Sequence, residues 1–301
     1  MFRRRQVIAV VCFGLICTFG SSLYGQLVSR YTFDHPVAGD PAREQDLGSD
    51  KTPVQLNNGA QRVDGGAFPG SGKALETKPI EGDTNNDHKA GVFFPDGSKG
   101  ANPSTMKGTS HVTGITIIGW FKPTIDPHGT TSMTGILCGD EGVPKADPHL
   151  GRALFEIENI GGGTRIVALG RRHDGDKRRK IRSNNTLEQD LPTGQWSHIA
   201  ATFDFDTGSI ILFRNGQPLA STITEPGTWE LTDGTDYTSN APAGGIKIGG
   251  QIEGDTTPFT GLIDEIRVYN TALPATGTMS VQSVYREQAG GPATQPSAAG
   301  R

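Results

Sequence analysis

Cysteine is scarce in this sequence. Three of the 301 residues are cysteines, and two of them, Cys12 and Cys17, lie in an apolar segment close to the N-terminus. If that segment is removed on export, Cys138 is left alone and no disulfide can form within the remaining chain. The folded state then depends on a sizeable hydrophobic core, with or without a bound metal ion, and a chain of this length can bury one.

Long apolar runs are also rare, and one of them has the form of an export signal. Val7 to Phe19 is apolar, three arginines at positions 3 to 5 precede it, and small residues follow it up to Gly25. We predict that residues 1–25 are a signal peptide, because this run is too short to span a bilayer. We therefore expect a secreted protein, extracellular or periplasmic, with no membrane span.

Helical periodicity and internal repeats are absent as well. No long segment places apolar residues at a period of 3.6, and we find no repeat of about 20–50 residues. Instead, 42 glycines and 19 prolines punctuate short runs rich in Ile, Val, Thr and Phe, as in an all-β protein. We expect one domain, residues 26–288, followed by a disordered tail at 289–301 that is rich in Gly, Pro, Ala and Ser.

Three segments carry the clearest strand patterns. Gln195 to Leu219 (QWSHIAATFDFDTGSIILFRNGQPL) alternates its side chains between two faces and contains Asn215-Gly216, the pair that a type I′ hairpin needs. Ile115 to Thr124 (ITIIGWFKPT) is apolar on both faces, as expected for a central strand of a covered sheet. Phe259 to Leu273 (FTGLIDEIRVYNTAL) has the pattern of a further strand near the C-terminus.

Together these segments resemble the laminin-G-like, concanavalin A-like jelly-roll family in its bacterial form. The family shows a W-x-H-[VI]-A-x-[TS]-[FYW]-[DN] strand, an F-T-[IV]-[SA]-x-W-[VF]-K-P strand and a G-x-I-D-E-[VI]-R-[IV]-Y-N-x-A-L closing strand. The resemblance runs from Leu27 to about Tyr285 and implies an all-β fold, an antiparallel two-sheet jelly-roll β-sandwich. In the family a short helix normally follows the closing strand. We do not expect it here, because PATGTMSV follows Leu273.

Asp264 is the most unusual single residue of the closing strand. It shares strand parity with Ile266 and Val268, which would place its carboxylate on an apolar face at a cost of several kcal/mol if it had no partner. One interpretation is that it accepts backbone N–H groups or pairs with an arginine. The other, implied by the resemblance, is a structural calcium ion, Ca²⁺, shared with Asp34 or Asp46, since related jelly rolls tie their chain ends together in this way.

Two other acidic segments have calcium-like spacing. The segment 83–87 (DTNND) departs from the EF-hand pattern because His88 stands in place of the glycine and Phe94 in place of the glutamate, so we favour a solvated loop. The segment 204–208 (DFDTG) lies between two strand patterns and is explained as a hairpin turn.

The segment from Arg171 to Arg182 (RRHDGDKRRKIR) is strongly basic, with seven Lys or Arg against two Asp. The rest of the chain is acidic, since the net charge of −4 becomes −7 when the three arginines of the signal leave. If the segment is a hairpin tip, its charges project together and favour a sulfated or uronic-acid polysaccharide. A solvated loop that protects a sheet edge is an equally good interpretation. The candidate ligand-binding residues are Arg171, Arg172, Lys177, Arg178 and Arg179.

Catalytic patterns are weak. Glu156 and Glu158 have the two-residue spacing of glycosidase carboxylates but lack the central Asp, and two outward glutamates are usually a polar face. His198 belongs to the family's strand motif, and we predict a structural role for it. We therefore expect non-catalytic binding of a polysaccharide, a cell-surface glycan or a protein, and no nucleic acid. A glycoside hydrolase or lyase of the same fold and a surface-structural adhesion protein are the alternatives, and the oligomeric state is open.

Overall fold

The computed structural model describes residues 25–80, 83–91, 107–109, 112–125, 130–138, 151–160, 163–171, 178–227, 243–250 and 257–290. The predicted signal peptide, apart from Gly25, and the predicted tail beyond residue 290 lie outside these residues. Within them, no helix is long and apolar enough to cross a membrane.

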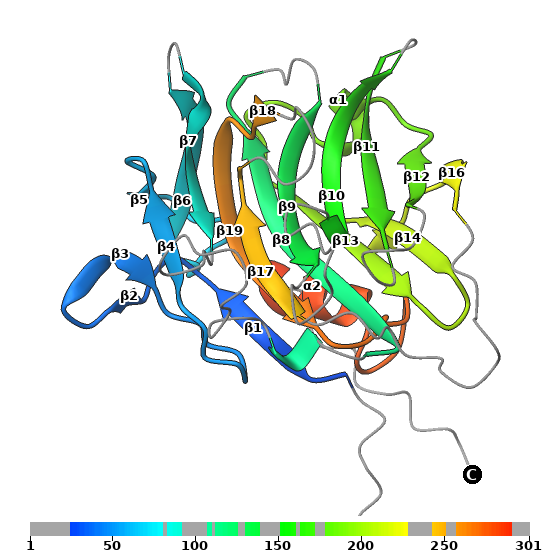
Figure 1. Ribbon diagram of the computed structural model, residues 1–301, viewed down its shortest axis with the longest axis horizontal. Coiled ribbons are helices and arrows are strands. Elements are labelled where there is room, and N and C mark those ends of the chain that lie inside the picture. The colour runs from blue at the N-terminus through cyan, green and yellow to red at the C-terminus, as the bar shows by residue number, and fades with distance from the viewer. Residues whose placement is uncertain are drawn as a thin grey trace, which may run out of the picture.

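The described strands form two antiparallel sheets that face each other (Figure 1). Sheet A contains β5 (Gln61–Asp64), β6 (Lys73–Ile80), β1 (Leu27–Tyr31), β19 (Gly261–Tyr269), β8 (Gly114–Pro123), β13 (Ser197–Asp204), β14 (Ser209–Arg214) and β15 (Gln217–Pro218). Sheet B contains β2 (Pro36–Val37), β3 (Asp40–Glu44), β4 (Val54–Asn57), β7 (Asp83–Gly91), β17 (Ala243–Ile248), β9 (Thr131–Cys138), β10 (Gly151–Ile160), β11 (Gly163–Gly170), β12 (Arg179–Ser183) and β16 (Ser221–Pro226).

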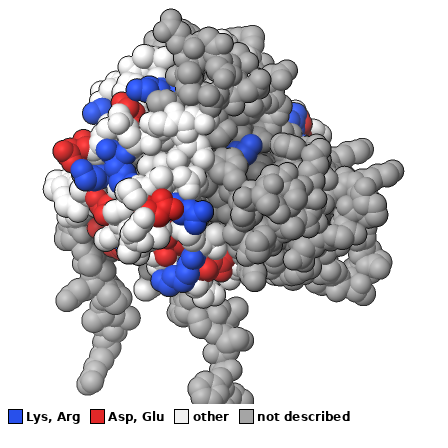
Figure 2. Space-filling view, turned by 60° about the vertical axis from the view of Figure 1, so that its left-hand side comes forward, with Lys and Arg blue, Asp and Glu red and all other residues white. Residues whose placement is uncertain are grey.

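A few elements lie outside this simple scheme. The short strand β18 (Thr257–Pro258) pairs with β9 in parallel, and β6 also pairs with β7, which links the two sheets. The helical elements are η1 (Lys107–Thr109), α1 (Leu187–Asp190) and α2 (Val281–Ala289). On the face that Figure 2 brings forward, basic and acidic side chains are interspersed.

The closing strand β19 lies in the middle of sheet A. One of its edges pairs with β8, and the other pairs with β1 and with β6 at different heights. The first and the last described strands are therefore neighbours, as the blue and orange arrows of Figure 1 show. This arrangement confirms the antiparallel two-sheet sandwich that the sequence predicted.

The core lies between the two sheets. Alternating residues of β8 point into it, including Ile115, Ile117 and Phe121, and the ring of Phe121 packs at right angles to those of Phe155 and Phe259. The other residues of β8 face outward, and all of them except the half-buried Lys122 are buried too, which confirms the prediction of a strand covered on both sides. What covers the outer face of sheet A is the C-terminal helix.

Helix α2, red in Figure 1, packs on the outer face of sheet A. The expectation that no helix follows the closing strand is therefore wrong. The seven residues after Leu273 precede the helix, and Ser280 then caps it, accepting a hydrogen bond from the Ser283 N–H at 3.0 Å. Gly290 ends it in a left-handed conformation, so the helix runs one residue into the predicted tail. Its apolar side, Val281 and Val284, seals a second small core.

Two predictions about turns have opposite outcomes. Asn215 and Gly216 have φ of 48° and 73°, so the predicted left-handed hairpin pair between β14 and β15 is confirmed. The segment 83–87, predicted to be a solvated loop, instead begins strand β7, which pairs with β6 at Asp83 and His88 and with β4 and β17 only further along. Polar residues can occupy a strand when neighbouring strands supply its backbone partners, and the local composition does not reveal that.

Candidate functional site

A β-bulge in β19 determines where the charged residues of this strand point. Asp264 is paired with Trp120 of β8, and Arg267 with Ile118, so three steps along β19 match two steps along β8. The extra residue is absorbed at Glu265, whose φ of 49° is in the left-handed region. After the bulge, every side chain of the strand lies on the face opposite to the one that simple alternation assigns.

The predicted orientation of Asp264 is wrong for this reason. Ile263, Ile266 and Val268 all belong to the core between the sheets. Asp264 instead shares the outer face with its ladder partner Trp120, because opposite residues of an antiparallel pair point the same way. Simple alternation cannot reveal the bulge that separates Asp264 from the two apolar residues after it.

Asp264 is fully buried on that outer face and receives several hydrogen bonds. The backbone N–H groups of Ala67 and Glu265 donate to its carboxyl group at 2.9 and 2.7 Å. Burial raises the pKa of Asp264 to about 8, and the negative charge of Glu265 adds to the rise, although the Ala67 hydrogen bond opposes it. The prediction that Asp264 accepts backbone N–H groups is confirmed. It ties residues 65–72, called the 65–72 turn below, to β19.

The other two predicted metal ligands also accept backbone N–H groups. Asp34 accepts the Lys73 N–H at 2.7 Å. Asp46 accepts three, from Arg30 at 2.9 Å, Gly48 at 2.7 Å and Thr52 at 3.1 Å. Among the described residues, no three His, Cys, Asp or Glu side chains lie close enough together to hold a metal ion. As arranged here, N–H donors point at the oxygens that Ca²⁺ would need, so calcium stays a prediction.

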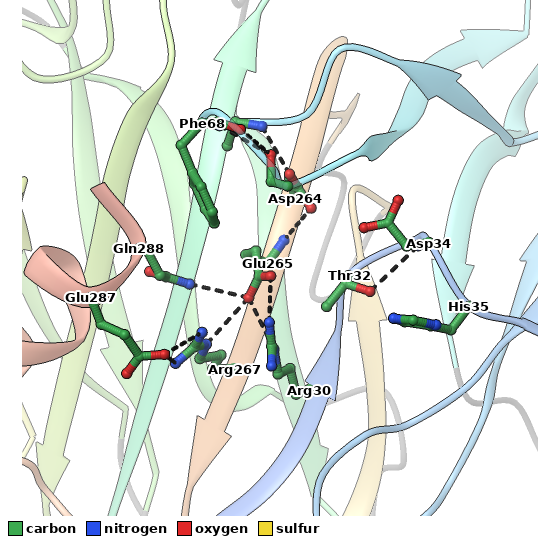
Figure 3. A network of polar contacts seen from close by, with 12 residues as sticks. Arg30, Thr32, Asp34, His35, Phe68, Asp264, Glu265, Arg267, Glu287 and Gln288 are labelled. Carbon is green, nitrogen blue, oxygen red and sulfur yellow. Dashed lines mark hydrogen bonds and ion pairs between the residues drawn. The ribbon is translucent and has the colours of Figure 1, made fainter. Parts of the chain in front are cut away.

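A network of charged side chains surrounds Glu265 (Figure 3). Arg30 from β1 donates through Nε and Nη2 at 3.1 and 2.7 Å, Arg267 through Nε at 3.3 Å, and Gln288 from α2 through Nε2 at 3.2 Å. Both terminal nitrogens of Arg267 also reach Glu287 at 3.3 Å. Burial would raise the pKa of Glu265, but the hydrogen bond from Arg30 and the charges of both arginines outweigh it and lower that pKa.

A pocket of about 240 Å³ opens beside this network, and we call it the β19 pocket. Its walls come from four separate parts of the chain: β1 with the residues after it, the 65–72 turn, β19 and α2. Figure 3 shows the side chains converging from these elements. The lining residues are Arg30, Thr32, Asp34, His35, Phe68, Gly70, Ser71, Glu265, Arg267, Glu287 and Gln288.

Sequence reasoning found only Asp34 among these lining residues. A signal was present in β19, where Glu265 and Arg267 interrupt an otherwise apolar strand. This signal alone does not predict the pocket, because the pocket also needs α2 and no helix was expected after the closing strand. Two partners of Glu265 lie on other elements: Arg30 is on β1, 235 residues earlier, and Gln288 is on α2, 23 residues later.

An aromatic cluster lies next to the pocket on the same face. Trp120 contacts Phe68 at a centroid distance of 5.7 Å and His198 at 5.3 Å, and His198 contacts Tyr285 at 5.3 Å. His198 is fully buried, and neither ring nitrogen has a hydrogen-bond partner among the described residues. Burial and the nearby charge of Arg267 lower the pKa of His198 to about 3. It packs as a neutral ring, in keeping with the structural role predicted for it.

Fewer charged side chains of the basic segment are exposed and unpaired than the sequence suggested. Arg171 is buried, and Arg178 makes a two-pronged ion pair with Glu225, at 2.8 Å through Nε and 2.6 Å through Nη2. Arg179 is half-buried at the start of β12. The remaining two candidates, Arg172 and Lys177, lie outside the described residues. The expectation that all these charges project together is therefore wrong for Arg171.

The two glutamates with glycosidase-like spacing lie on the outer face of sheet B, opposite to the core residues Phe155 and Ile157, but both are buried rather than exposed. Glu158 on β10 forms a hydrogen-bonded ion pair with Lys180 on β12, and Lys180 also contacts Glu225 on β16 at 2.9 Å. Glu156 is buried one step along the same face of β10. Hydrogen bonds to Glu158 and Glu225 and the charges of these two residues outweigh burial and raise the pKa of Lys180. The arrangement is that of a structural ion pair across the sheet.

Comparison with solved structures finds similarity to several kinds of protein. A botulinum neurotoxin serotype D/C binding domain has a TM-score of 0.52 at 10% identity, covering 87% of this chain and 52% of its own. A Trypanosoma rangeli sialidase has 0.51 at 14%, covering 89% and 34%. Domain 4 of a GH43 arabinanase from Geobacillus stearothermophilus has 0.49 at 20%, covering 87% and 99%. The chain thus spans about half of the toxin domain and a third of the sialidase.

Comparison with curated protein sequences finds no match. The family comparison does: the concanavalin A-like lectin/glucanases superfamily matches residues 96–276, more than half of the chain. That match covers β8, β13, β14 and β19, which form most of sheet A and carry the motifs described above. The chain belongs to the concanavalin A-like lectin/glucanases superfamily.

Proposed function

We propose that the protein is a non-catalytic carbohydrate-binding module and that the β19 pocket holds the ligand. The observation that carries this proposal is the pocket itself, in which ordered donors and acceptors stand beside the ring of Phe68. Binding sites for small ligands typically combine a concave shape with a few fixed polar groups that set the orientation of the ligand. Membership of a lectin and glucanase superfamily makes carbohydrate the natural ligand class.

The rigidity of the polar groups supports this role. Arg30, Arg267 and Gln288 are all bonded to the same buried carboxylate, Glu265. Their side chains are therefore ordered before a ligand arrives, and less entropy is lost on binding. Proteins of the same fold include botulinum neurotoxin type C, whose cell entry is dependent upon interaction with two ganglioside molecules.

Binding is favoured over catalysis by the state of Glu156 and Glu158. A retaining or inverting glycosidase needs two carboxyl groups that face the scissile bond, one of them able to give up a proton. Glu158 instead lies against Lys180 in a buried ion pair. A glycoside hydrolase or lyase that uses other residues, and a surface-structural adhesion protein, are the competing proposals.

Three finer expectations belong to the proposal. They are export through the signal peptide at 1–25, a stabilising Ca²⁺ held by Asp264 with Asp34 or Asp46, and a preference for acidic polysaccharide through Arg172, Lys177 and Arg179. The first suits a glycan ligand outside the cell. The last relies on residues at or near the tip of the basic segment, because Arg178 is paired with Glu225.

A glycan-binding screen of residues 26–301, in calcium and in chelator, tests the proposal. Variants His35→Ala and Glu287→Gln change two pocket residues with exposed side chains. Variant Glu188→Gln, on the exposed side of α1, is the matched control. We expect glycan binding that both pocket variants weaken and the control leaves unchanged, whereas loss in chelator would support calcium. Failure to bind any glycan, with the protein folded, would sink the proposal in favour of a protein-binding or structural role.

A further inference from the structure

The lining of the β19 pocket carries charges of both signs that already compensate one another. Arg30 uses two of its nitrogens on Glu265, and Arg267 is shared between Glu265 and Glu287. With Asp34, the lining holds three carboxylates against two arginines. An acidic ligand would have to compete with carboxylates for the guanidinium groups and would add negative charge where negative charge is already in excess.

A neutral ligand rich in hydroxyl groups can bind to the same lining without adding negative charge or displacing the carboxylates. A hydroxyl group both donates and accepts, so adjacent hydroxyls can donate to a carboxylate and accept from a guanidinium at the same time. The lining offers both kinds of group near its mouth. The side chain of Arg30 is 33% exposed and that of Glu287 is 67% exposed. Hydrogen bonds to charged groups are about twice as strong as those between neutral ones.

The size of the pocket limits how much of a sugar chain it can hold. Pockets for drug-sized ligands measure about 300–1,000 Å³, and the β19 pocket, at about 240 Å³, is smaller. Four separate parts of the chain wall it in, and the half-buried ring of Phe68 stands on one side. The space therefore suits one sugar ring, entering as a terminal or branch residue, better than a polysaccharide lying along a groove.

Building on the carbohydrate-binding function proposed above, we infer that the β19 pocket recognises a single neutral sugar ring, at a chain end or branch, and discriminates against its uronic acid. This is the reverse of the charge preference expected from the basic segment. The discrimination resides in the pocket carboxylates, chiefly the exposed Glu287. Removing its charge brings the carboxylates and arginines of the lining into balance.

Calorimetric titration with matched sugars tests the inference. The probes are glucose and glucuronic acid, galactose and galacturonic acid, and arabinose oligomers of increasing length, at low and high salt. We expect a neutral sugar to bind about tenfold more tightly than its acid. We also expect affinity to stop rising beyond the first one or two units, and salt to change the affinity of the neutral sugar little.

Glu287→Gln is the informative variant, because it keeps the shape of the side chain and removes its charge. The preference for the neutral sugar should shrink severalfold, and this shift in relative affinity is a change that general loosening of the fold would not produce. Glu188→Gln on α1 should leave the preference unchanged, and thermal unfolding of both variants checks that they fold. Tighter binding of the uronic acids, or affinity that keeps growing with chain length, would overturn the inference and leave carbohydrate binding intact. Absence of binding to every sugar would overturn both.

Discussion

His198 shows how one side chain can make the protein sensitive to acid. Its ring lies between Trp120 and Tyr285, and it remains neutral because protonation would place a charge in a site without partners and near Arg267. The pKa of His198 is about 3 in the folded protein and near 6.5 in an unfolded chain. Between these two pKa values the unfolded state binds a proton that the folded state does not bind, so the free energy of unfolding falls as the pH falls.

The variant His198→Leu removes this titration. We expect its unfolding free energy to decline less than that of the parent protein between pH 6.5 and pH 4, measured as urea midpoints across the series. At pH 7 the change should be within about 1.5 kcal/mol, because the volume is nearly kept and no hydrogen bond to the ring is lost. Parallel pH profiles for the two proteins would show that the ring does not stay neutral.

Asp264 has the opposite effect at higher pH, where it makes the free energy of unfolding fall as the pH rises. Its pKa of about 8 in the folded protein lies far above the ordinary value of 3.8, so the folded state holds a proton that the unfolded state releases between the two. Its contribution to stability is complete below about pH 4 and is lost as the pH rises through 8. We expect Asp264→Asn to flatten the decline between pH 5 and pH 8 in the same urea titrations. An equally steep decline in Asp264→Asn would contradict the assignment. So would an equal flattening of the decline in the control Glu188→Gln.

At this scale the sequence showed that Asp264 is unusual and gave the acceptance of backbone N–H groups as one of two interpretations, but it did not show which face Asp264 occupies. The face depends on the bulge at Glu265, a non-glycine residue with positive φ, and nothing in the residue type announces that conformation. The same holds for the contacts of Glu265 outside its own strand. Arg30 lies on β1 and Gln288 on α2, and only the complete fold brings these elements together with β19.

At the scale of elements, strand patterns were the reliable signal. The alternation in residues 195–219 predicted strand β13 and the hairpins that connect it to β14 and β15, and the double apolar face of residues 115–124 predicted the central strand β8. Helix α2 was missed because its stability comes from Ser280 and from a narrow apolar side facing sheet A, rather than from a long periodic segment. The pocket was missed with it.

The ion pair that joins β10, β12 and β16 is an element-scale feature with a testable cost. Lys180→Met would leave Glu158 buried without its cation, and breaking a buried pair typically costs about 3–5 kcal/mol. We expect a loss of that order in chemical unfolding, and recovery of most of it in the double variant Lys180→Met with Glu158→Leu. The matched control, Lys73→Met, removes an exposed pair with Asp64 and should change little. A Lys180 variant as stable as the parent would show that the pair is dispensable.

At the scale of the whole molecule, the adjacency of β1 and β19 joins the two ends of the domain. Leu27 lies opposite Tyr269, and Tyr31 opposite Ile266, while Val28 and Tyr31 are fully buried. We expect a chain of residues 26–290 to unfold cooperatively, and a chain that begins at Thr32 to lose that transition, because the edge of β19 and the adjoining core would open. Circular dichroism during heating compares the two. A cooperative transition in the shorter chain would show that β1 is not needed for the cooperative fold.

The position of β19 also governs when this protein can fold. Its partners β1, β6 and β8 are all made earlier, yet each has an open edge until the closing strand emerges at Gly261. Contacts between residues so far apart in sequence form slowly, because a long loop must first be closed. A ribosome that stops before this point therefore releases a chain that cannot complete sheet A. The fold of the described domain thus depends on a strand that is made late, and a product that ends before Gly261 is left open to proteolysis.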